Sequence, residues 1–435
     1  MAERVSVAVL GGGLTGLSAS LHLQRAGVQH RAFEREAVPG GHAITIEEQG
    51  FRFDRTGHLL HLRDPGMQAL ASELLPPAQY RKIARRSAIF SHGAYTRYPF
   101  QANTFGLPPE VAHECLSGFL AAYYAPHKPE PKSFEEFCLV HFGAGISKHF
   151  MLPYNARLWG VPPSEVTSEW CQRFVPLPQL EDVLRGAVGA QAPELGYNAS
   201  FWYPELGIGS FSAALAAQTS LELSRAPRAL DLTRRVLVFE DEEVPFDVLV
   251  SSIPLPSLLR LMSALPPAVA QAAKRLRATH LHYFDLGLRV PNPNPYHWIY
   301  VPEERYPFYR VGCYTHFSDK LAPPGKSSLY VELAERRAPN PERALEAVVA
   351  GLRELGLLRS AQDIELWRLR TIEYAYVIYD HHYRAALDVI EPFLKEQRIV
   401  SSGRYGAWNY SSMEDALIMG RDAARTAHAL LGSAT

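Results

Sequence analysis

Three glycines near the N-terminus have the spacing of a nucleotide-binding turn. Gly11, Gly13 and Gly16 form a Gly-x-Gly-x-x-Gly motif that directly follows the apolar run 5–10. In such a motif the first glycine permits a tight turn, the second lets the backbone approach a pyrophosphate, and the third lets a helix pack closely on a strand. The free N–H groups at the start of that helix favour a phosphate. The alternative is a tight strand–helix turn that binds nothing.

An acidic residue and a second glycine-rich loop narrow the choice of ligand. Glu34 lies eighteen residues after Gly16, at the end of a second short apolar segment, where its carboxylate can accept hydrogen bonds from a ribose diol. Two further glycines follow in the run 40–42, and a Gly-His pair stands at 57–58. A simple nicotinamide dehydrogenase would continue with another strand and helix here, whereas a second glycine loop suits a larger cofactor. FAD is therefore the predicted cofactor.

These features resemble the FAD-binding superfamily that includes amine oxidases, protoporphyrinogen oxidases and UDP-galactopyranose mutases. A second match lies near the C-terminus, where a strand ends in Gly403-Arg404 and a helix begins at about Met413. The resemblance implies that this segment closes over the flavin pyrophosphate and points helix N–H groups at the pyrimidine edge of the ring. The alternative is a glycine turn with a surface arginine. The expected cofactor-binding residues are Gly11, Gly13, Leu14, Thr15, Gly16, Glu34, Arg35, Gly40, Gly41, His42, Gly57, His58, Gly403, Arg404 and Met413.

A third stretch, residues 153–165, resembles the helical domain of the UDP-galactopyranose mutases, and Arg173 follows it by eight residues. The resemblance implies that Tyr154 stacks on uracil and that Arg173 and Arg310 grip the nucleotide-sugar diphosphate. Two arginines from separate elements can hold a diphosphate by charge-assisted forks, which lysine would do less selectively. The expected substrate-binding residues are Tyr154, Asn155, Trp159, Arg173, Tyr197, Arg310 and Tyr410, and the expected catalytic residues are His58, Arg173, Arg310 and Tyr410.

Each of these residues also has a purely structural interpretation. The aromatic residues could pack in the core, and the arginines could be surface ion-pair partners that contribute little to stability. His58 and His61 could be hydrogen-bonded core histidines. The sequence also departs from the mutases at Leu333, where they usually carry a tyrosine, and at Ser412, where they commonly carry an aspartate. Both changes are expected near the sugar, so the sugar need not be galactose.

Composition argues against several classes of function. The 435 residues include 44 Lys and Arg against 45 Asp and Glu, so neither a nucleic acid nor another polyanion is an expected partner. The four cysteines are scattered, and the run 380–382 has no third ligand at a suitable spacing, so neither disulfides nor a metal site is expected. The long apolar stretch 248–269 is interrupted by four prolines and cannot span a membrane. Because the chain opens on a predicted strand and not on a signal peptide, a cytoplasmic location is expected.

The elements that position these residues are predicted to form an α/β fold. It combines a Rossmann-type FAD-binding domain with a helical insertion and an antiparallel-sheet substrate domain. The aromatic-rich β pattern between residues 279 and 335 is expected to form the floor of the substrate site. The expected domains are a discontinuous FAD-binding domain over 1–75, 205–262 and 392–435, a mostly helical domain over 76–204, and an antiparallel-sheet substrate domain over 263–391.

Three functions fit these patterns. The first is an FAD-dependent pyranose–furanose mutase that uses the N5 atom of reduced flavin on a nucleoside-diphosphate sugar, with no net redox change. The second is an FAD-dependent oxidoreductase of the amine oxidase or protoporphyrinogen oxidase type. The sequence shows no obvious lysine placed like the one beside flavin N5 in amine oxidases. The third is a non-catalytic dinucleotide-binding protein. The paired arginines and Tyr154 favour the mutase, so a small molecule is the expected partner.

Overall fold

The apolar run at the N-terminus forms a central strand of a largely parallel sheet. In the computed structural model, which describes residues 4–190 and 199–432 apart from the side chains of residues 172 and 173, this strand is β1 (Val5–Leu10). It lies between β2 (His30–Phe33) and β12 (Glu243–Ser251), and both pair with it in parallel. Apolar residues of β1 are buried on both faces, as expected for a parallel strand that is covered by helices. The remaining strands of this sheet are β9 (Leu221–Glu222), β10 (Ala229–Asp231), β11 (Val236–Val238) and β18 (Ile399–Ser401).

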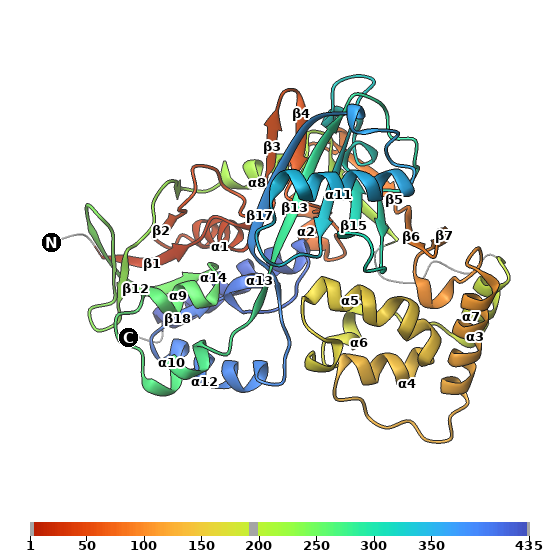
Figure 1. Cartoon of the computed structure of the whole chain (residues 1–435). Coiled ribbons are helices and arrows are strands. Elements are labelled where there is room, and N and C mark those ends of the chain that lie inside the picture. The colour runs from red at the N-terminus through yellow and green to blue at the C-terminus, as the bar shows by residue number, and fades with distance from the viewer. Residues whose placement is uncertain (1–3, 191–198, 433–435) are drawn as a thin grey trace.

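Two helices from opposite ends of the chain pack together beside this sheet (Figure 1). They are α1 (Leu14–Arg25) and α14 (Met413–Gly432). A Cβ atom at Gly420 of α14 would clash with the carbonyl oxygen of Thr15 in α1, so the glycine allows the two backbones to approach. The C-terminal segment therefore lies directly against the glycine turn that opens α1. Nearby elements are β3 (Thr45–Glu48), β4 (Phe51–Asp54), α2 (Pro65–Leu74) and α8 (Gly209–Ala216).

A second sheet is antiparallel except where β14 pairs with β6. Its order is β17-β13-β16-β15-β14-β6-β7, and α11 lies across it in Figure 1. The amphipathic helix α11 (Pro341–Glu354) begins at Asn340, whose side chain accepts a hydrogen bond from the Arg343 N–H, and its Gly351 packs on Phe308. The strands are β6 (Ser87–Ser91), β7 (Ala94–Arg97), β13 (Ala278–Leu288), β14 (Trp298–Tyr300), β15 (Phe308–Cys313), β16 (Ser327–Leu333) and β17 (Ile364–Val377).

Helices α3 to α7 gather on one side of the molecule, at the lower right of Figure 1. The longest two begin at clear signals: α3 has proline at its first position, and Ser133 caps α4 by accepting a hydrogen bond from the Glu136 N–H. These helices are α3 (Pro109–Tyr123), α4 (Phe134–Ile146), α5 (Leu152–Trp159), α6 (Cys171–Phe174) and α7 (Leu180–Ala187). The other elements are β5 (Tyr80–Ala84), β8 (Ser200–Pro204), α9 (Leu255–Leu261), α10 (Pro267–Ala273), α12 (Tyr383–Glu396) and α13 (Gly403–Gly406).

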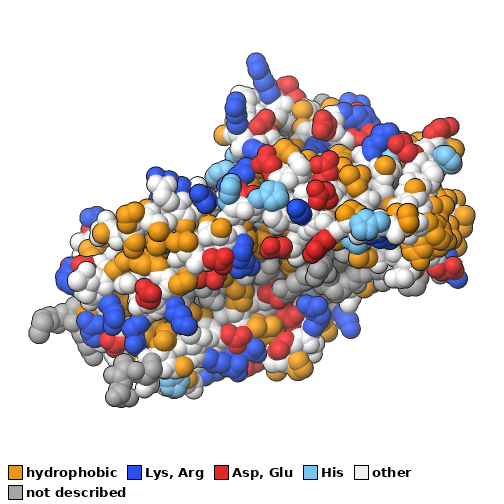
Figure 2. All heavy atoms as spheres, turned by 90° about the horizontal axis from the view of Figure 1, so that it is seen from below, with side chains coloured by type: hydrophobic (Ala, Val, Ile, Leu, Met, Phe, Trp, Pro, Cys, Tyr) orange, Lys and Arg blue, Asp and Glu red, His pale blue; other side chains and the backbone are white. Residues whose placement is uncertain are grey.

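The arrangement confirms the predicted α/β class, with a Rossmann-type sheet, a helical region and an antiparallel sheet. Two features of the second sheet were not predicted. Strands β6 and β7 come from the segment predicted to be mostly helical, and β17 is an unexpected long edge strand. On the face drawn in Figure 2, acidic and basic side chains are interspersed, in keeping with the net charge of −1.

Candidate functional site

The turn between β1 and α1 leaves one side of its backbone open. A Cβ atom at Gly16 would clash with the carbonyl oxygen of Gly11, and one at Gly11 would lie 2.5 Å from Ser252 Oγ, so these glycines permit close packing. At Gly13, by contrast, the nearest heavy atom to such a Cβ would be Gly41 Cα, at 3.9 Å. No side chain in the described part of the chain caps the start of α1. The turn therefore keeps room and free N–H donors beside Gly13.

Glu34 directly follows β2 and lies against this turn. Its buried carboxylate accepts a hydrogen bond from the Gly12 N–H at Oε2 (2.6 Å) and from the Glu36 N–H at Oε1 (2.9 Å). These bonds hold the carboxylate at the edge of the turn, and each oxygen keeps a further lone pair. Its predicted role as a ribose acceptor stays a prediction.

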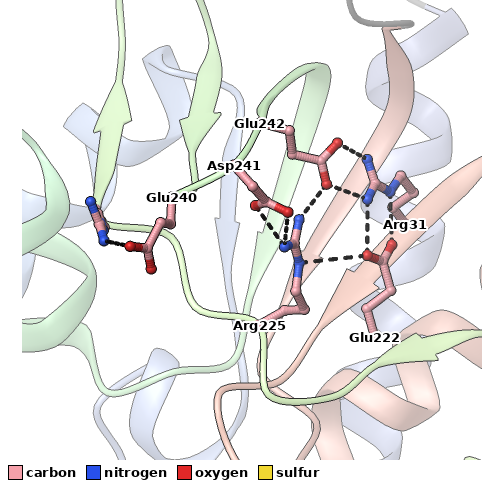
Figure 3. Close-up of polar contacts among 7 residues, drawn as sticks. Arg31, Glu222, Arg225, Glu240, Asp241 and Glu242 are labelled. Carbon is pink, nitrogen blue, oxygen red and sulfur yellow. Dashed lines mark hydrogen bonds and ion pairs between the residues drawn. The ribbon is translucent and has the colours of Figure 1, made fainter.

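A network of ion pairs fastens the backbone that carries Glu34 (Figure 3). Arg31 of β2 donates two hydrogen bonds to Glu222 (2.7 and 2.9 Å) and two to Glu242 (2.8 and 3.1 Å). Arg225 also pairs with Glu242, and its backbone N–H donates to the Glu34 carbonyl at 2.8 Å. The network therefore ties β2, β9 and the β11–β12 hairpin together behind the acidic residue.

The second glycine loop is bonded directly to the first. The Gly40 N–H donates to the Gly12 carbonyl at 2.7 Å, so the two loops form one continuous edge, which we call the glycine cradle (residues 11–16 and 40–42). His42 meets the ring of Tyr405 edge to face, with centroids 5.3 Å apart. Burial lowers the pKa of His42 to about 3, so this imidazole is neutral at pH 7.

The C-terminal segment closes over one side of the glycine cradle. Gly403 has φ +85°, and a Cβ there would clash with Thr15 Oγ1, so only glycine fits this approach. The Thr15 hydroxyl also donates to the Ala416 carbonyl at 3.0 Å. Met413, the first residue of α14, is buried beneath this contact. Ser412 exchanges hydrogen bonds with Asp415 and caps the same helix.

Two arginines, two tyrosines and one buried carboxylate form a connected cluster. We call Arg310, Glu332, Tyr376, Arg404 and Tyr410 the guanidinium–phenol cluster. Arg310 donates to Glu332 Oε1 (2.6 Å) and to the hydroxyl of Tyr376 (3.0 Å). The Arg404 guanidinium lies over the ring of Tyr410 at 4.6 Å, and the rings of Tyr410 and Tyr376 stack with centroids 6.2 Å apart. The stacked phenols therefore connect the two arginines.

The cluster keeps hydrogen-bonding capacity that the described residues do not use. Arg310 Nε, Arg404 Nε and Glu332 Oε2 are all buried without a hydrogen-bond partner in the described part of the chain. Buried polar atoms nearly always have partners in folded proteins. The cluster is thus equipped for a polar ligand that both donates and accepts.

His58 lies beside the cluster, on the loop after β4. A Cβ at the preceding Gly57 would lie 2.7 Å from the hydroxyl of Tyr330, which places this loop against β16. Burial, together with the positive charges of Arg404 and Arg310, lowers the pKa of His58 to about 4. His58 is therefore a neutral imidazole at pH 7, and its Nδ1 has no partner among the described residues.

Tyr154, predicted to stack on a base, and Trp159, predicted to bind substrate, are both buried on α5. The ring of Tyr154 stacks on Phe150 (5.2 Å between centroids, 7° between planes) and meets the edge of Tyr300 at 5.3 Å. Trp159 contacts the ring of Tyr376 at 5.8 Å. The Asn155 amide donates back to the helix. The structure brings Tyr154 and Trp159 next to the cluster, while one face of Tyr154 already packs on protein.

The structure does not test the predicted roles of several residues. Arg35 is exposed and pairs with Glu36, and its contact with the cofactor stays a prediction. His61, which was not among the predicted site residues, interacts with the Ser200 carbonyl. Tyr197 and the side chain of Arg173 lie outside the described residues. Phe174, which follows Arg173 in α6, contacts the ring of Tyr410 with centroids 4.6 Å apart. The convergence of Arg173 and Arg310 therefore stays a prediction.

The expectation that Leu333 stands near the sugar is wrong. Alternation along β16 places Tyr330 and Glu332 toward His58 and Arg310, whereas Leu333 is buried in the apolar core beneath α11. Sequence reasoning missed Glu332, Tyr330 and Tyr376. The period of two in β16 was the signal that could have identified the first two.

No helix among the described residues is long and apolar enough to cross a membrane. Those residues also contain no group of three or more His, Cys, Asp or Glu side chains arranged to hold a metal ion.

Comparison with known proteins places this geometry among flavoproteins. A crystal structure of reduced UDP-galactopyranose mutase superposes with a TM-score of 0.91 and 26% identity over 98% of this chain and 96% of that one. A candidate protoporphyrinogen oxidase from Exiguobacterium shares the fold, with a TM-score of 0.74 and 16% identity over 98% of both chains. The phytoene dehydrogenase of Streptomyces griseus is 46% identical over 112 residues, which span 26% of this chain and only 22% of that protein.

The predicted superfamily is confirmed, and a flavin is the implied cofactor. The family described as flavin containing amine oxidoreductase matches residues 14–428, nearly the whole chain. The chain belongs to the flavin containing amine oxidoreductase family.

Proposed function

We propose that the flavin is FAD, held by the glycine cradle, Glu34 and the Gly403–Arg404 segment. The room beside Gly13 and the uncapped start of α1 suit a pyrophosphate, which FMN lacks. The Glu34 carboxylate suits the ribose hydroxyls of the adenosine half. The residues present therefore fit a flavin dinucleotide.

We further propose that the chain is an FAD-dependent nucleotide-sugar pyranose–furanose mutase. The observation that carries this proposal is the guanidinium–phenol cluster. Arg404 links it to the segment that closes over the glycine cradle, and the contact of Tyr376 with Trp159 links it to α5. Arginine recognises a diphosphate through paired N–H donors, and Tyr154 and Trp159 offer apolar surface for a base. The end-to-end similarity to reduced UDP-galactopyranose mutase supports the same assignment.

In this proposal the protein binds and orients while the cofactor carries the covalent chemistry. Reduced flavin, when bound, supplies a nucleophilic nitrogen. Arg310, supported by Glu332, holds negative charge on the departing nucleoside diphosphate and keeps it in place for return. Neutral His58 donates or accepts a hydrogen bond near the reacting sugar without adding a positive charge. Buried Tyr376, with the buried Tyr330 beside it, helps to exclude water from the cluster.

The second candidate is an FAD-dependent oxidoreductase, which the family description and the phytoene dehydrogenase match favour. The resemblance to amine oxidases would require a lysine beside the flavin. All eight lysines lie in the described part of the chain; seven are exposed, and the eighth, Lys326, pairs with Glu365. No lysine is therefore available inside the cluster, which weighs against the amine oxidase type.

The identity of the flavin and the type of reaction can be tested one after the other. Denaturation of the purified protein should release FAD and not FMN, and Glu34→Ala should lower the amount retained. The protein is then reduced with dithionite without oxygen and offered UDP-, GDP- and dTDP-hexoses. A pyranose–furanose interconversion followed by NMR, dependent on reduction but consuming no electron acceptor, is the expected result. Bleaching of the oxidised flavin by an amine or a porphyrinogen, with no nucleotide sugar bound, would assign the oxidoreductase instead.

A further inference from the structure

A separate pocket of about 540 Å³ lies between the end of α5, helices α9 and α10, and strands β13 and β17. Its mouth is formed by the exposed side chains of Arg260, Arg277, His280 and Glu373, and buried Trp159 and Trp408 line its interior. This volume is in the range that takes a small organic molecule, about 300–1,000 Å³. Of the predicted substrate residues only Trp159 lines it, so the pocket is distinct from the guanidinium–phenol cluster.

The charge of the pocket lining is predominantly positive. Three arginines and one carboxylate, Glu373, line it. Arg260 donates only to neutral hydroxyls, Ser257 Oγ at 2.9 Å and Tyr374 OH at 3.1 Å, and no carboxylate of the described residues pairs with it. Arg277 shares a single nitrogen between Glu165 and Asp380, at 3.2 and 3.3 Å. Arg260 therefore carries an uncompensated charge at the pocket mouth.

The polar atoms left unpaired in the lining are all donors. Trp159 Nε1, Trp408 Nε1 and Arg336 Nε are buried without a hydrogen-bond partner among the described residues, and no unpaired acceptor accompanies them in the lining. The rest of the Arg336 guanidinium is used: it donates to the carbonyls of Arg157, Leu158 and His280 and so caps the end of α5. An excess of donors beside aromatic rings favours an acceptor-rich ligand with a flat apolar part.

We propose that this pocket binds a small organic anion, a phosphate or carboxylate attached to a ring. Its oxyanion lies against Arg260 and Arg277, and its ring packs on the aromatic lining around Trp159 and Tyr374. Glu373 opposes the ligand by repulsion and so limits its affinity. The pocket shares β17 with the guanidinium–phenol cluster, because Tyr374 lines the pocket while Tyr376, two residues on, binds Arg310.

The proposal can be tested by titration calorimetry on the flavin-loaded protein. Phenyl phosphate carries both recognised groups, inorganic phosphate lacks the ring, and benzyl alcohol lacks the charge. Phenyl phosphate should bind at one site and more tightly than either fragment. Arg260→Gln should weaken it about tenfold or more, as expected for a lost charge-assisted bond. Glu373→Gln should tighten it several-fold, because repulsion is removed.

Two matched variants distinguish binding in this pocket from binding elsewhere on the protein. Arg275→Gln changes an exposed arginine of the same segment that does not line the pocket, and it should leave the affinity for phenyl phosphate unchanged. Arg310→Gln should likewise leave phenyl phosphate bound but weaken UDP, which distinguishes failure of this proposal from failure of the proposed function. Four results would each overturn the proposal. The affinity for phenyl phosphate could fall equally in Arg260→Gln and Arg275→Gln, or fall in Arg310→Gln. It could also fall in Glu373→Gln, or the wild type could show no saturable binding.

Discussion

Arg310 is the residue on which the proposed diphosphate site most depends. Its guanidinium is held by Glu332 and Tyr376, so the fork geometry is fixed before any ligand arrives. Lysine keeps the charge but loses the fork, and Arg310→Lys should weaken UDP by about tenfold or more. Arg305→Lys, at an exposed arginine paired with Glu354, is the matched control and should bind UDP normally. If calorimetry finds the same affinity for UDP in Arg310→Lys as in the wild type, Arg310 does not bind the diphosphate.

Asp54 gives the fold a pH dependence that can be measured. Its buried carboxyl accepts hydrogen bonds from Thr45, Tyr203 and the Ile208 N–H, yet burial raises its pKa to about 7. The native state therefore keeps a proton up to about pH 7, whereas the unfolded chain, with a carboxyl pKa near 4, releases it at a lower pH. This group stabilises the fold fully below about pH 4 and loses that contribution as pH rises to about 7, at up to about 1.4 kcal/mol per pH unit.

Replacing Asp54 with asparagine should remove this contribution. Between pH 4 and 7 the Tm of the wild type should fall relative to that of Asp54→Asn, because only the wild type loses a proton there. Thermal melts of both proteins in matched buffers measure the difference. A difference in Tm that stays constant over this range would show that Asp54 is ionised in the folded protein throughout.

At the scale of single elements, the Gly403 turn decides whether the C-terminal segment can close. Gly403→Ala adds a Cβ that clashes with Thr15 and also strains a φ of +85°. We expect this variant to lose most of its flavin, measured as the ratio of absorbance at 450 and 280 nm. Gly93→Ala is the control for backbone strain alone, because Gly93 has φ +75° but open space around its Cβ position. Equal flavin retention in both variants would mean that closure of this segment does not hold the cofactor.

The ion-pair network behind Glu34 should be measurable by its response to salt. Arg31→Met removes four hydrogen bonds between β2, β9 and the β11–β12 hairpin. The network is partly exposed, so the loss should be about 1 kcal/mol at low ionic strength and smaller in 1 M NaCl. Arg185→Met, which breaks one exposed i,i+4 pair, should change the Tm less. A salt-independent loss in Arg31→Met would point instead to the contact of the Arg31 guanidinium with the ring of Phe33, 5.0 Å from its centroid.

Local spacing and long-range pairing explain what the sequence could and could not reveal. The glycine turn, Glu34 and Gly403 were predictable because each needs only a short run of residue types. The alternation along β16 could have identified Glu332 as a site residue, but its partner could not be predicted, because the partner depends on the register that sets Glu332 opposite Arg310 across β15 and β16. Tyr376 lies on β17, an edge strand whose pairing with β13 brings together residues about ninety positions apart. The Leu333 prediction failed because the comparison with the tyrosine of the mutases did not take the alternation of faces along β16 into account.

For the whole molecule, flavin binding should couple to global stability. The glycine cradle and the Gly403–Arg404 segment that closes over it come from opposite ends of the chain. A ligand that binds only the assembled state stabilises it by mass action, about 2.7 kcal/mol at a hundredfold excess over Kd. Protein stripped of flavin should therefore melt several degrees lower and recover on addition of FAD. Scanning fluorimetry of the stripped and reloaded protein measures this. Identical melting curves would mean that the cradle is not the flavin site.

The approach of Gly403 to Thr15 also has a consequence for how the protein is made. The glycine turn and the segment that closes it are separated by 392 positions (403 − 11). At a translation rate of about 5–20 residues per second, the turn is synthesised roughly 20–80 s before the segment that closes over it. During that interval the glycine cradle lacks the segment that closes over one side of it. We therefore expect flavin to bind during biosynthesis, before helix α14 packs against the glycine turn.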